Sequence, residues 1–353
     1  MQIIFLSERT LAVLGYGYAS DDFEIILDSL VPQQSFFHVN LNSISASVGD
    51  YLTVRKKNYF YIGIITAIEK IEDNYIKVTT KDFLSKFDVE VPVNSYTGNI
   101  SQFIVNLIRA HFVYSSDPKQ NLSYLQTQIM INKTGTLNYE PDKKVNILKL
   151  VAEFSKTYGL RLGYELVITN GQITNIKILV LAITKGLIIK SNLGAITNLN
   201  IADSNTNALN KIIFYPKADN VTYQNIITYY LLNDGTISNY TNSPKRIPIV
   251  SFKCEFYSDK DYTSLSTKAT SALIDSSLEH NITFDFSFLT NRITDLTDLS
   301  VGTFVNFITP HKTYETLVTK MVYKGTFNKS TITLGEQRIS LTDKLKLLNR
   351  RGI

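Results

Sequence analysis

Two stretches far apart in the chain share a residue pattern and the same spacing to a later strand. The first, Ser47-Val48-Gly49-Asp50-Tyr51-Leu52-Thr53-Val54, leads to Ile64-Ile65-Thr66; the second, Ser300-Val301-Gly302-Thr303-Phe304-Val305-Asn306-Phe307, leads to Leu317-Val318-Thr319. The spacing from Val to Thr is identical, since 66 − 48 = 18 and 319 − 301 = 18. Glycine before a strand permits a sharp bend. The shared register predicts two related β-barrel modules, although strand-rich segments also resemble one another by chance.

Most of the remaining chain also has the composition of β-strands. Leu52–Val54, Tyr59–Ile68 and Tyr75–Thr80 are rich in Ile, Val, Thr and Tyr, and polar turns separate them at hairpin spacing. Asp234-Gly235 lies between two apolar runs, where glycine can adopt the positive φ that a tight turn requires. The sequence therefore predicts a mainly β fold with a hairpin at Asp234-Gly235.

Three segments interrupt the strand pattern with helical periodicity. The first has apolar residues on one face at Ile100, Phe103, Ile104, Leu107, Ile108 and His111. The second is expected to begin at Asp142 as N-cap and to end at Gly159, with an apolar stripe of Val145, Leu148, Val151, Ala152 and Phe154. A third is expected from Ser264 to about Leu278. We expect these stripes to be core faces without a cofactor.

The order of these elements predicts an α+β, mainly β fold with two related β-barrel modules and an inserted α+β domain. The first barrel is expected at residues 1–95, and the insert with its two helices at 96–200. The second barrel is expected at 201–340, interrupted by a helical segment near 262–280, and residues 341–353 are expected to form a helix or linker.

Composition and charge narrow the class of protein. Charged residues make up 19% of the 353 residues, below the roughly 25% of soluble domains, so Asn, Ser, Thr and Tyr must cover much of the surface. Such a surface suits wet protein interfaces, but an AT-rich genome would also supply it. The net charge of +5 is spread thinly, which argues against a nucleic-acid-binding arm. The basic cluster of Lys344, Lys346, Arg350 and Arg351 reads as a solvated tail; a positive channel for DNA is the alternative.

Cysteine usage and the N-terminal segment indicate where the protein folds. Cys254 is the single cysteine, which excludes an internal disulfide, and a free, buried thiol is expected in a reducing cytoplasm. The first ten residues lack the basic start of a signal peptide. The most apolar window, Ile176 to Lys190, contains two lysines and is too short to span a bilayer.

No arrangement of residues predicts catalysis. His38, His111, His280 and His311 lie far apart in sequence; His111 is expected in the core, and His280 at the surface beside Glu279. Gly15-Tyr16-Gly17 is a lone GxG without the strand–helix context of a dinucleotide site. Asp21-Asp22 and the Asp295/Asp298 pair supply carboxylates of the kind that glycoside hydrolysis uses, yet acidic turns are common in β proteins. We predict no catalytic, cofactor-binding or metal-binding residue, no cofactor and no enzyme.

Two other classes of function stay open at this point. A hydrolase of cell-wall glycan or peptide would need a clustered acid/base pair or a metal site. A carbohydrate-binding adhesin would use some of the 21 Tyr and 19 Phe as stacking platforms, although most of them alternate within apolar strands and the chain has no Trp.

The chain resembles a known family along nearly its whole length. The resemblance rests on Gly49–Val54, Tyr59–Thr66, Lys81-Asp82-Phe83-Leu84, Asn207–Ile212, Tyr229–Ile237 and Ile332–Leu341. In order and spacing these segments resemble siphophage tail-associated proteins, which are baseplate hubs similar to the central hub of contractile phages and to type VI secretion spike proteins. Long relatives continue into a fibre or a peptidoglycan-degrading domain, so a short natural form or a truncated chain is expected, without lytic activity.

The resemblance implies a structural role at the distal tip of a phage tail. Three copies are expected to form a ring in which two barrels per chain give pseudo-sixfold symmetry, so that a homotrimer matches a sixfold tail. The implied partners are a distal tail protein, a tape-measure protein and receptor-binding proteins, with no stable small-molecule ligand. The ring would close the tail tube of the virion and open for transient DNA passage on host contact. The protein would be made in the cytoplasm of the host bacterium.

Overall fold

In the computed structural model the chain divides into two compact units. The first comprises Met1–Leu199 and Phe284–Thr333, and the second Asn200–Thr283 and Leu334–Ile353. The structure describes residues 1–28, 32–56, 59–72, 74–139, 142–183, 187–203, 209–232, 236–242, 252–277, 280–288 and 299–335. Each unit has its own hydrophobic core.

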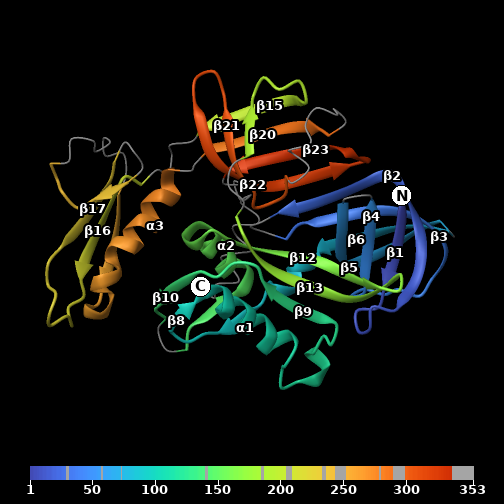
Figure 1. The fold of residues 1–353 in the computed structure, drawn as a ribbon, viewed down its shortest axis with the longest axis horizontal. Coiled ribbons are helices and arrows are strands. Elements are labelled where there is room, and N and C mark those ends of the chain that lie inside the picture. Colours follow the sequence, from blue (N-terminus) through green and yellow to red (C-terminus); the bar gives the residue numbers. More distant parts are fainter. Residues whose placement is uncertain are drawn as a thin grey trace. The chain divides into compact units, whose positions relative to one another are not determined.

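The first unit begins with a closed barrel, drawn in blue in Figure 1. Its strands are β1 (Gln2–Leu6), β2 (Val13–Asp28), β3 (Gln34–Ile44), β4 (Tyr51–Lys56), β5 (Tyr59–Glu72) and β6 (Tyr75–Asp82). Among the described residues these six strands follow the order β1-β4-β5-β6-β3-β2, and antiparallel pairing of β1 with β2 closes the barrel. Alternate residues point inward, so the rings of Phe37 and Tyr61 meet at 5.9 Å inside it.

An α+β insert follows the barrel. Its elements are η1 (Phe83–Phe87), β7 (Glu90–Pro92), β8 (Tyr96–Asn99), α1 (Ile100–Phe112), η2 (Pro118–Gln120), β9 (Leu125–Ile129), β10 (Thr134–Leu137), β11 (Lys144–Asn146), α2 (Ile147–Tyr158), β12 (Leu160–Thr169) and β13 (Gln172–Ala182). The two predicted helices are confirmed as α1 and α2. Asn99 caps α1 by accepting from Gln102 N, and α2 ends at Gly159 with φ 65°, as predicted.

The predicted start of α2 is wrong. Its N-cap is Asn146, whose side chain accepts from Lys149 N, and not Asp142. Residues 144–146 are held in extended conformation as β11 because they pair antiparallel with β7, with Val145 opposite Val91. A tertiary strand pairing therefore delays the helix by one turn.

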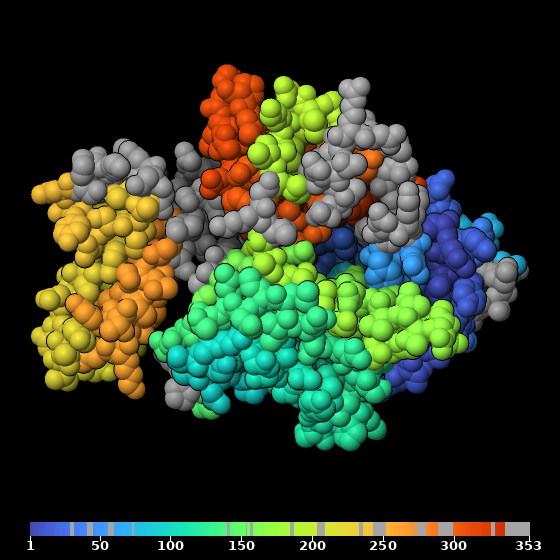
Figure 2. Space-filling view, in the orientation of Figure 1, coloured from blue at the N-terminus to red at the C-terminus, as the bar shows by residue number. Residues whose placement is uncertain are grey.

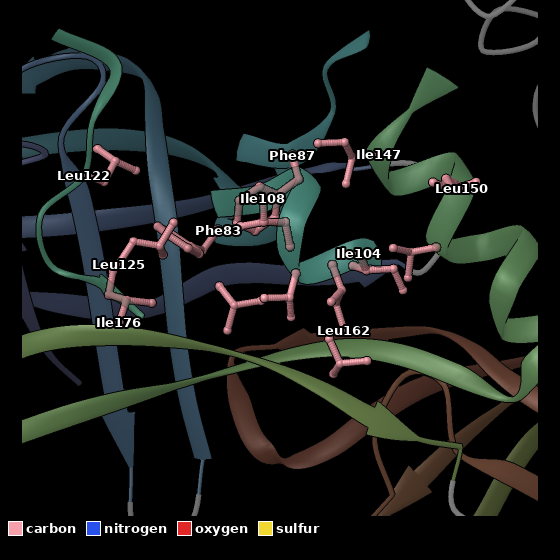
Figure 3. Packing of buried hydrophobic residues seen from close by; sticks show 14 of the residues in the cluster. Phe83, Phe87, Ile104, Ile108, Leu122, Leu125, Ile147, Leu150, Leu162 and Ile176 are labelled. Carbon is pink, nitrogen blue, oxygen red and sulfur yellow. The ribbon is translucent and has the colours of Figure 1, made fainter. Parts of the chain in front are cut away.

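The insert packs its helices onto the outside of the barrel. Figure 3 shows Phe83 and Phe87 of η1 beside Ile108 of α1, with Leu162 of β12 and Ile176 of β13 on the other side of the same cluster. Ile62 of β5 and Tyr51 of β4 belong to this cluster and are fully buried. The core of the first unit therefore extends without interruption from the barrel wall into the insert.

A second set of six strands repeats the neighbour order of the barrel. These strands are β14 (Leu187–Lys190), β15 (Ile196–Asp203), β20 (His280–Ser287), β21 (Phe304–Ile308), β22 (Thr313–Lys324) and β23 (Thr326–Gly335). Their order among the described residues is β14-β21-β22-β23-β20-β15, and each strand has the chain position of its counterpart in β1-β4-β5-β6-β3-β2. This set is called the second module below. The predicted mainly β, α+β class with two related modules is confirmed.

The two modules differ in one pairing and are joined by another. β1 is antiparallel to β4, whereas β14 is parallel to β21. The C-terminal half of β2 pairs antiparallel with the C-terminal half of β22, from Glu24 opposite Lys324 to Asp28 opposite Lys320. The barrel and the second module therefore share one continuous sheet (Figure 1).

The second unit interrupts the second module between β15 and β20. It contains β16 (Lys211–Pro216), β17 (Ile227–Leu231), β18 (Ile237–Ser238), β19 (Phe252–Tyr257), η3 (Asp259–Ser264) and α3 (Leu265–Ser277). Figure 2 shows orange α3 packed against the yellow strands, where Leu265, Ala269 and Leu273 meet Ile212 and Phe214. The predicted third helix is confirmed.

The predicted hairpin is confirmed by its strands. β17 pairs antiparallel with β18, with Leu231 opposite Ile237. The turn residues Asp234 and Gly235 themselves lie outside the described residues.

The division at residues 1–95, 96–200, 201–340 and 341–353 stays a prediction. β14 and β15, at Leu187–Lys190 and Ile196–Asp203, begin before residue 201, and the chain after Gly335 lies outside the described residues. In the part of the chain that is described, no helix combines the length and the apolar character that a membrane crossing requires.

Candidate functional site

The repeated sequence stretch forms the same hydrogen-bonded turn in both modules. Gly49 N donates to Ile65 O at 2.9 Å, and Ile65 N donates to Asp50 O at 2.8 Å. In the second module Gly302 N donates to Val318 O at 2.7 Å, and Val318 N donates to Thr303 O at 2.9 Å. The offset is constant, because 302 − 49 = 253 and 318 − 65 = 253. The predicted repeat is therefore confirmed at the level of single backbone bonds.

Glycine is required at the bend of each turn. Gly49 has φ 102° and Gly302 has φ 84°, in the region that L-residues with a Cβ rarely adopt. The next residue then fastens the turn through its side chain. Asp50 Oδ2 accepts from Ser47 N at 2.9 Å, and Thr303 Oγ1 accepts from Ser300 N at 3.1 Å. A carboxylate and a hydroxyl at equivalent positions thus accept the same backbone hydrogen bond.

Asp50 also ties the turn to the start of the chain. Its Oδ1 accepts from Glu8 N at 2.9 Å, across the gap between β4 and the β1–β2 connection. Glu8 in turn forms an ion pair with Lys86 of η1. The first turn is therefore linked to the insert, in addition to its own strands.

The strand junction between the two modules is the second structural feature of this region. Lys324 Nζ lies 2.6 Å from Glu24 Oε2 across the β2–β22 pair, and Lys320 Nζ donates to Gln33 Oε1 at 2.8 Å. Backbone pairing fixes the distance between the modules, and these side chains favour the observed register. The junction therefore joins the two modules through backbone pairing in one sheet.

A buried carboxyl joins the barrel to the insert. Asp82 ends β6, and its Oδ1 accepts from Leu84 N at 2.9 Å while its Oδ2 accepts from the hydroxyl of Tyr164 on β12 at 2.8 Å. Burial raises the pKa of the Asp82 carboxyl from 3.8 to about 6, and the two hydrogen bonds offset only part of that rise. Burial likewise raises the pKa of Tyr61, with the Asp82 charge as a further cause.

The interior of the barrel beside Asp82 is tightly packed around a glycine. Tyr61 OH and Thr80 Oγ1 are hydrogen-bonded at 2.9 Å. A Cβ at Gly63 would lie 2.6 Å from Thr80 Cβ and 2.8 Å from the Tyr61 hydroxyl, so only glycine fits. In the second module Thr316 takes this position, since 316 − 253 = 63, and it is also buried.

A surface hollow of about 440 Å³ lies over the insert. Its lining includes Glu8, Lys86, Glu90, His111 and Phe112. His111 was expected in the core, but it is half-buried in this lining because it lies in the last turn of α1, past the buried face. The ion pair of Glu8 with Lys86 neutralises both charges within the hollow.

The other predicted candidates are scattered over the first unit. His38 Nδ1 lies 3.0 Å from Asp22 Oδ2 on the outside of the barrel, and its ring stacks on Tyr75 at 5.8 Å. Gly15-Tyr16-Gly17 lies within β2, paired with β1, and not at a strand-to-helix turn. His311 is exposed in the turn between β21 and β22, whereas Asp295 and Asp298 lie outside the described residues.

Two burial predictions are wrong for the same reason. His280 was expected at the surface, yet it is 6% exposed because it shares the inward face of β20 with Ile282, Phe284 and Phe286. Cys254 was expected to be buried, yet it is exposed because it shares the outward face of β19 with Phe252 and Phe256. Strand parity, which the sequence does not reveal without the partner strands, decides both.

Side-chain clusters that could bind a metal or catalyse a reaction are few among the residues that the structure describes. They hold no group of three or more His, Cys, Asp or Glu side chains with the geometry to bind a metal ion. Asp22 and His38 are the predicted candidates that the fold brings together; their separation of sixteen residues gave no signal of this in the sequence. Sequence reasoning missed the joint of Asp82 with Tyr164, for which Lys81-Asp82-Phe83-Leu84 at a strand end was the available signal.

Comparison with known proteins places the fold. No family model matches the sequence, and no curated protein matches it. The solved tail protein from Neisseria meningitidis MC58 is similar with a TM-score of 0.58 at 13% identity, over 97% of this chain and 98% of that chain. Prophage tail protein gp18 from Listeria monocytogenes EGD-e gives 0.57 at 13% identity, over 99% of both chains.

A chain of the phage P2 baseplate in its activated conformation gives a TM-score of 0.50 at 13% identity, over 96% of this chain and 99% of that chain. At such identities the likeness concerns the fold, and it extends over at least 96% of each of the chains named here. The chain therefore has the fold of phage tail proteins.

Proposed function

We propose that the chain is the structural hub of a phage tail-tip baseplate. Three copies form a ring that closes the tail tube in the virion and opens for transient DNA passage on host contact. The observation that carries the proposal is the internal repeat: two modules with the same turn and the same strand order are joined edge to edge in one chain. Three such chains present six similar surfaces, as a sixfold tail requires.

The full-length likeness to tail proteins and to a baseplate chain supports this proposal over its rivals. The role is mechanical and not enzymatic, and it involves no cofactor and no stable small-molecule ligand. The expected partners are a second and third copy of the chain, a distal tail protein, a tape-measure protein and receptor-binding proteins. The chain would be made in the bacterial cytoplasm and would function at the distal end of the tail.

The first test is the solution mass of the purified chain, by light scattering at several concentrations. The proposal expects a trimer, alone or after coexpression with a distal tail protein, and a ring with six similar lobes by electron microscopy. A strict monomer under all these conditions would overturn the hub. Cleavage of peptidoglycan by the purified chain would favour the hydrolase class instead.

A carbohydrate-binding adhesin is the second candidate because two aromatic side chains are exposed on one face of β2. Tyr16 is 52% exposed and Tyr18 is 61% exposed, and residues two apart on a strand share a face. Exposed tyrosines form stacking platforms for sugars. Binding to cell-wall glycan that Tyr18→Ala abolishes, and that Tyr240→Ala at another exposed tyrosine leaves intact, would support the adhesin.

A further inference from the structure

The two equivalent turns each pack against a charged side chain. In the barrel, a Cβ at Gly49 would lie 4.0 Å from Glu8 Oε2, and Glu8 forms an ion pair with Lys86. In the second module, a Cβ at Gly302 would lie 2.8 Å from Cδ of Arg161, which belongs to β12. The repeat therefore allows a direct comparison of two charges at equivalent turns.

The charge at the second turn lacks a counter-charge. Within the part of the chain that the structure describes, Arg161 forms no ion pair and no side-chain hydrogen bond, and its Nε is buried without a partner. Glu165 lies on the same face of β12, but it is already paired with Lys177 at 2.8 Å. The carboxylate nearest along the strand is therefore engaged elsewhere.

Packing holds the Arg161 side chain in place. Its neighbours on β12, Leu160 and Leu162, are buried in the core, so Arg161 lies on the opposite face of the strand. The aliphatic part of the side chain lies across Gly302, with Cγ 3.9 Å from the Cβ position there. Nη1 lies 4.0 Å from the Cβ position of Gly163, so the guanidinium extends along β12. The residue as a whole is half-buried, which leaves part of it accessible from outside.

An unpaired guanidinium is costly in such a place. Burial lowers the pKa of the Arg161 guanidinium, and no neighbouring carboxylate opposes this effect. Arginine nevertheless stays charged in proteins, and charged side chains that leave water are as a rule paired. The planar fork of a guanidinium matches two oxygens of a carboxylate or phosphate group. An oxyanion at the accessible side of Arg161 would therefore supply the missing counter-charge.

We propose that Arg161 is an oxyanion-binding site, which takes a carboxylate or phosphate group from outside the chain. Two sources supply this chemistry, namely a free phosphate anion and the carboxylate of an acidic side chain on a partner protein. The ion pair of Glu8 with Lys86 shows how the equivalent turn in the barrel is neutralised within the chain. The inference does not depend on the proposed hub, because it rests on the surroundings of one side chain.

Nuclear magnetic resonance of the guanidinium tests the site directly. In the isotope-labelled chain, the Nε–H resonance of Arg161 is identified by its loss in Arg161→Lys. Inorganic phosphate and acetate are then titrated separately up to about 50 mM, at an ionic strength kept constant with chloride. We expect a saturable shift of this resonance with at least one of the two anions. The exposed Arg55 on β4 is the matched control, and its Nε–H resonance should show no saturable shift.

Removing the charge gives an independent readout. Arg161→Met keeps an unbranched stem on Gly302 without the guanidinium, so its melting temperature in chloride should equal or exceed that of the unmodified chain. A bound anion should raise the melting temperature of the unmodified chain by about 2 °C or more at roughly ten times its Kd. Arg161→Met should lose this rise, whereas the control Arg55→Met should keep it.

The outcomes separate the two sources and decide the proposal. A shift with acetate, alone or together with phosphate, identifies a site for carboxylates, as on an acidic partner surface. A shift with phosphate alone identifies a site for phosphate. The absence of a saturable shift with both anions, or an equal rise in melting temperature for Arg161→Met, would overturn the site. A clear fall in the melting temperature of Arg161→Met in chloride would also count against it, because the charge would then be compensated within the chain.

Discussion

The barrel and the second module share a backbone plan but differ on their outer faces. Tyr61 in the barrel and Tyr314 in the second module both point inward, at positions that differ by the offset of 253. One residue further, Ile62 is fully buried beneath the insert, whereas its counterpart Glu315 is exposed. The inner face and the turn therefore define the module, and the outer face has adapted to what covers it.

The comparison also separates what a repeat must keep from what it can change. Both modules keep a glycine with positive φ and a side-chain acceptor in the turn, Asp50 in one and Thr303 in the other. They differ in the direction of the first strand, which is antiparallel to its neighbour in the barrel and parallel in the second module. Bends are constrained by sterics at single residues, while edge strands are constrained only by what lies beside them.

Exchanging residues between the outer faces of the two modules should give the largest change in the free energy of unfolding. Ile62→Glu places a carboxylate in the cluster between barrel and insert and should lower the free energy of unfolding by about 4 kcal/mol or more, enough to prevent folding. The reverse exchange, Glu315→Ile, should change it by about 0.5 kcal/mol or less. Urea unfolding followed by circular dichroism measures both. Equal losses at the two positions would contradict the difference between the outer faces.

Adding a methyl group inside the barrel should give the next largest loss of stability. Gly63→Ala would force its Cβ against Thr80 and the Tyr61 hydroxyl, and overpacking of this kind costs about 1–3 kcal/mol. The matched control is Gly194→Ala, because a Cβ at Gly194 meets no atom within 4 Å. Thermal melts compare the two variants. An unchanged melting temperature for Gly63→Ala would mean that the barrel interior is less tightly packed than the distances show.

The buried carboxyl of the barrel should make stability depend on pH. The folded-state pKa of Asp82, about 6, lies above its unfolded value of 3.8, so the folded chain binds the proton more tightly. This contribution is fully present below pH 4 and is lost as pH rises through 6. Asp82→Asn removes the charge, while its Oδ1 can still accept from Leu84 N and its Nδ2 can donate to the Tyr164 hydroxyl in place of accepting from it. The variant should raise the free energy of unfolding at pH 8 by up to about 2 kcal/mol relative to its effect at pH 4.

The two chains to compare are the unmodified chain and Asp82→Asn. The measurement is urea unfolding of both chains from pH 4 to pH 8. Parallel pH profiles for the unmodified chain and Asp82→Asn would show that the carboxyl does not titrate in this range.

Substitutions in the two turns should give the smallest losses of stability, and the loss should be larger in the barrel than in the second module. Asp50→Ala removes an acceptor for two backbone N–H groups, on Ser47 and Glu8, and should cost about 1.5 kcal/mol. Thr303→Ala removes the acceptor for Ser300 N and should cost about 0.5 kcal/mol. Melting temperatures test the order. A larger loss for Thr303→Ala would show that the link from Asp50 to the start of the chain contributes little.

Much of the fold could be predicted because its signals are local. The repeat, the three helices and the glycine at the end of α2 each depend on a few neighbouring residues, and the structure confirms them. The start of α2 could not be predicted, because pairing of β11 with β7 competes with the helical pattern. The exposures of His280 and Cys254 could not be predicted either, because one step of strand parity moves a side chain to the other face.

The candidate site was less visible in the sequence than the fold. The two bonded turns were predicted by the repeat itself, but the Asp82–Tyr164 joint connects residues that are 82 positions apart. The stretch Lys81-Asp82-Phe83-Leu84 marks a strand end, but it does not reveal that Tyr164 lies beside Asp82. Its raised pKa arises only when the insert closes over the barrel and removes water from the carboxyl.

The sequence by itself determined the presence of two related modules and the bend at the start of each, because glycine sterics operate over short distances. The tertiary structure alone decided which outer face is covered and which strand edges meet. Those outcomes depend on the packing of segments more than a hundred residues apart, which no local pattern encodes.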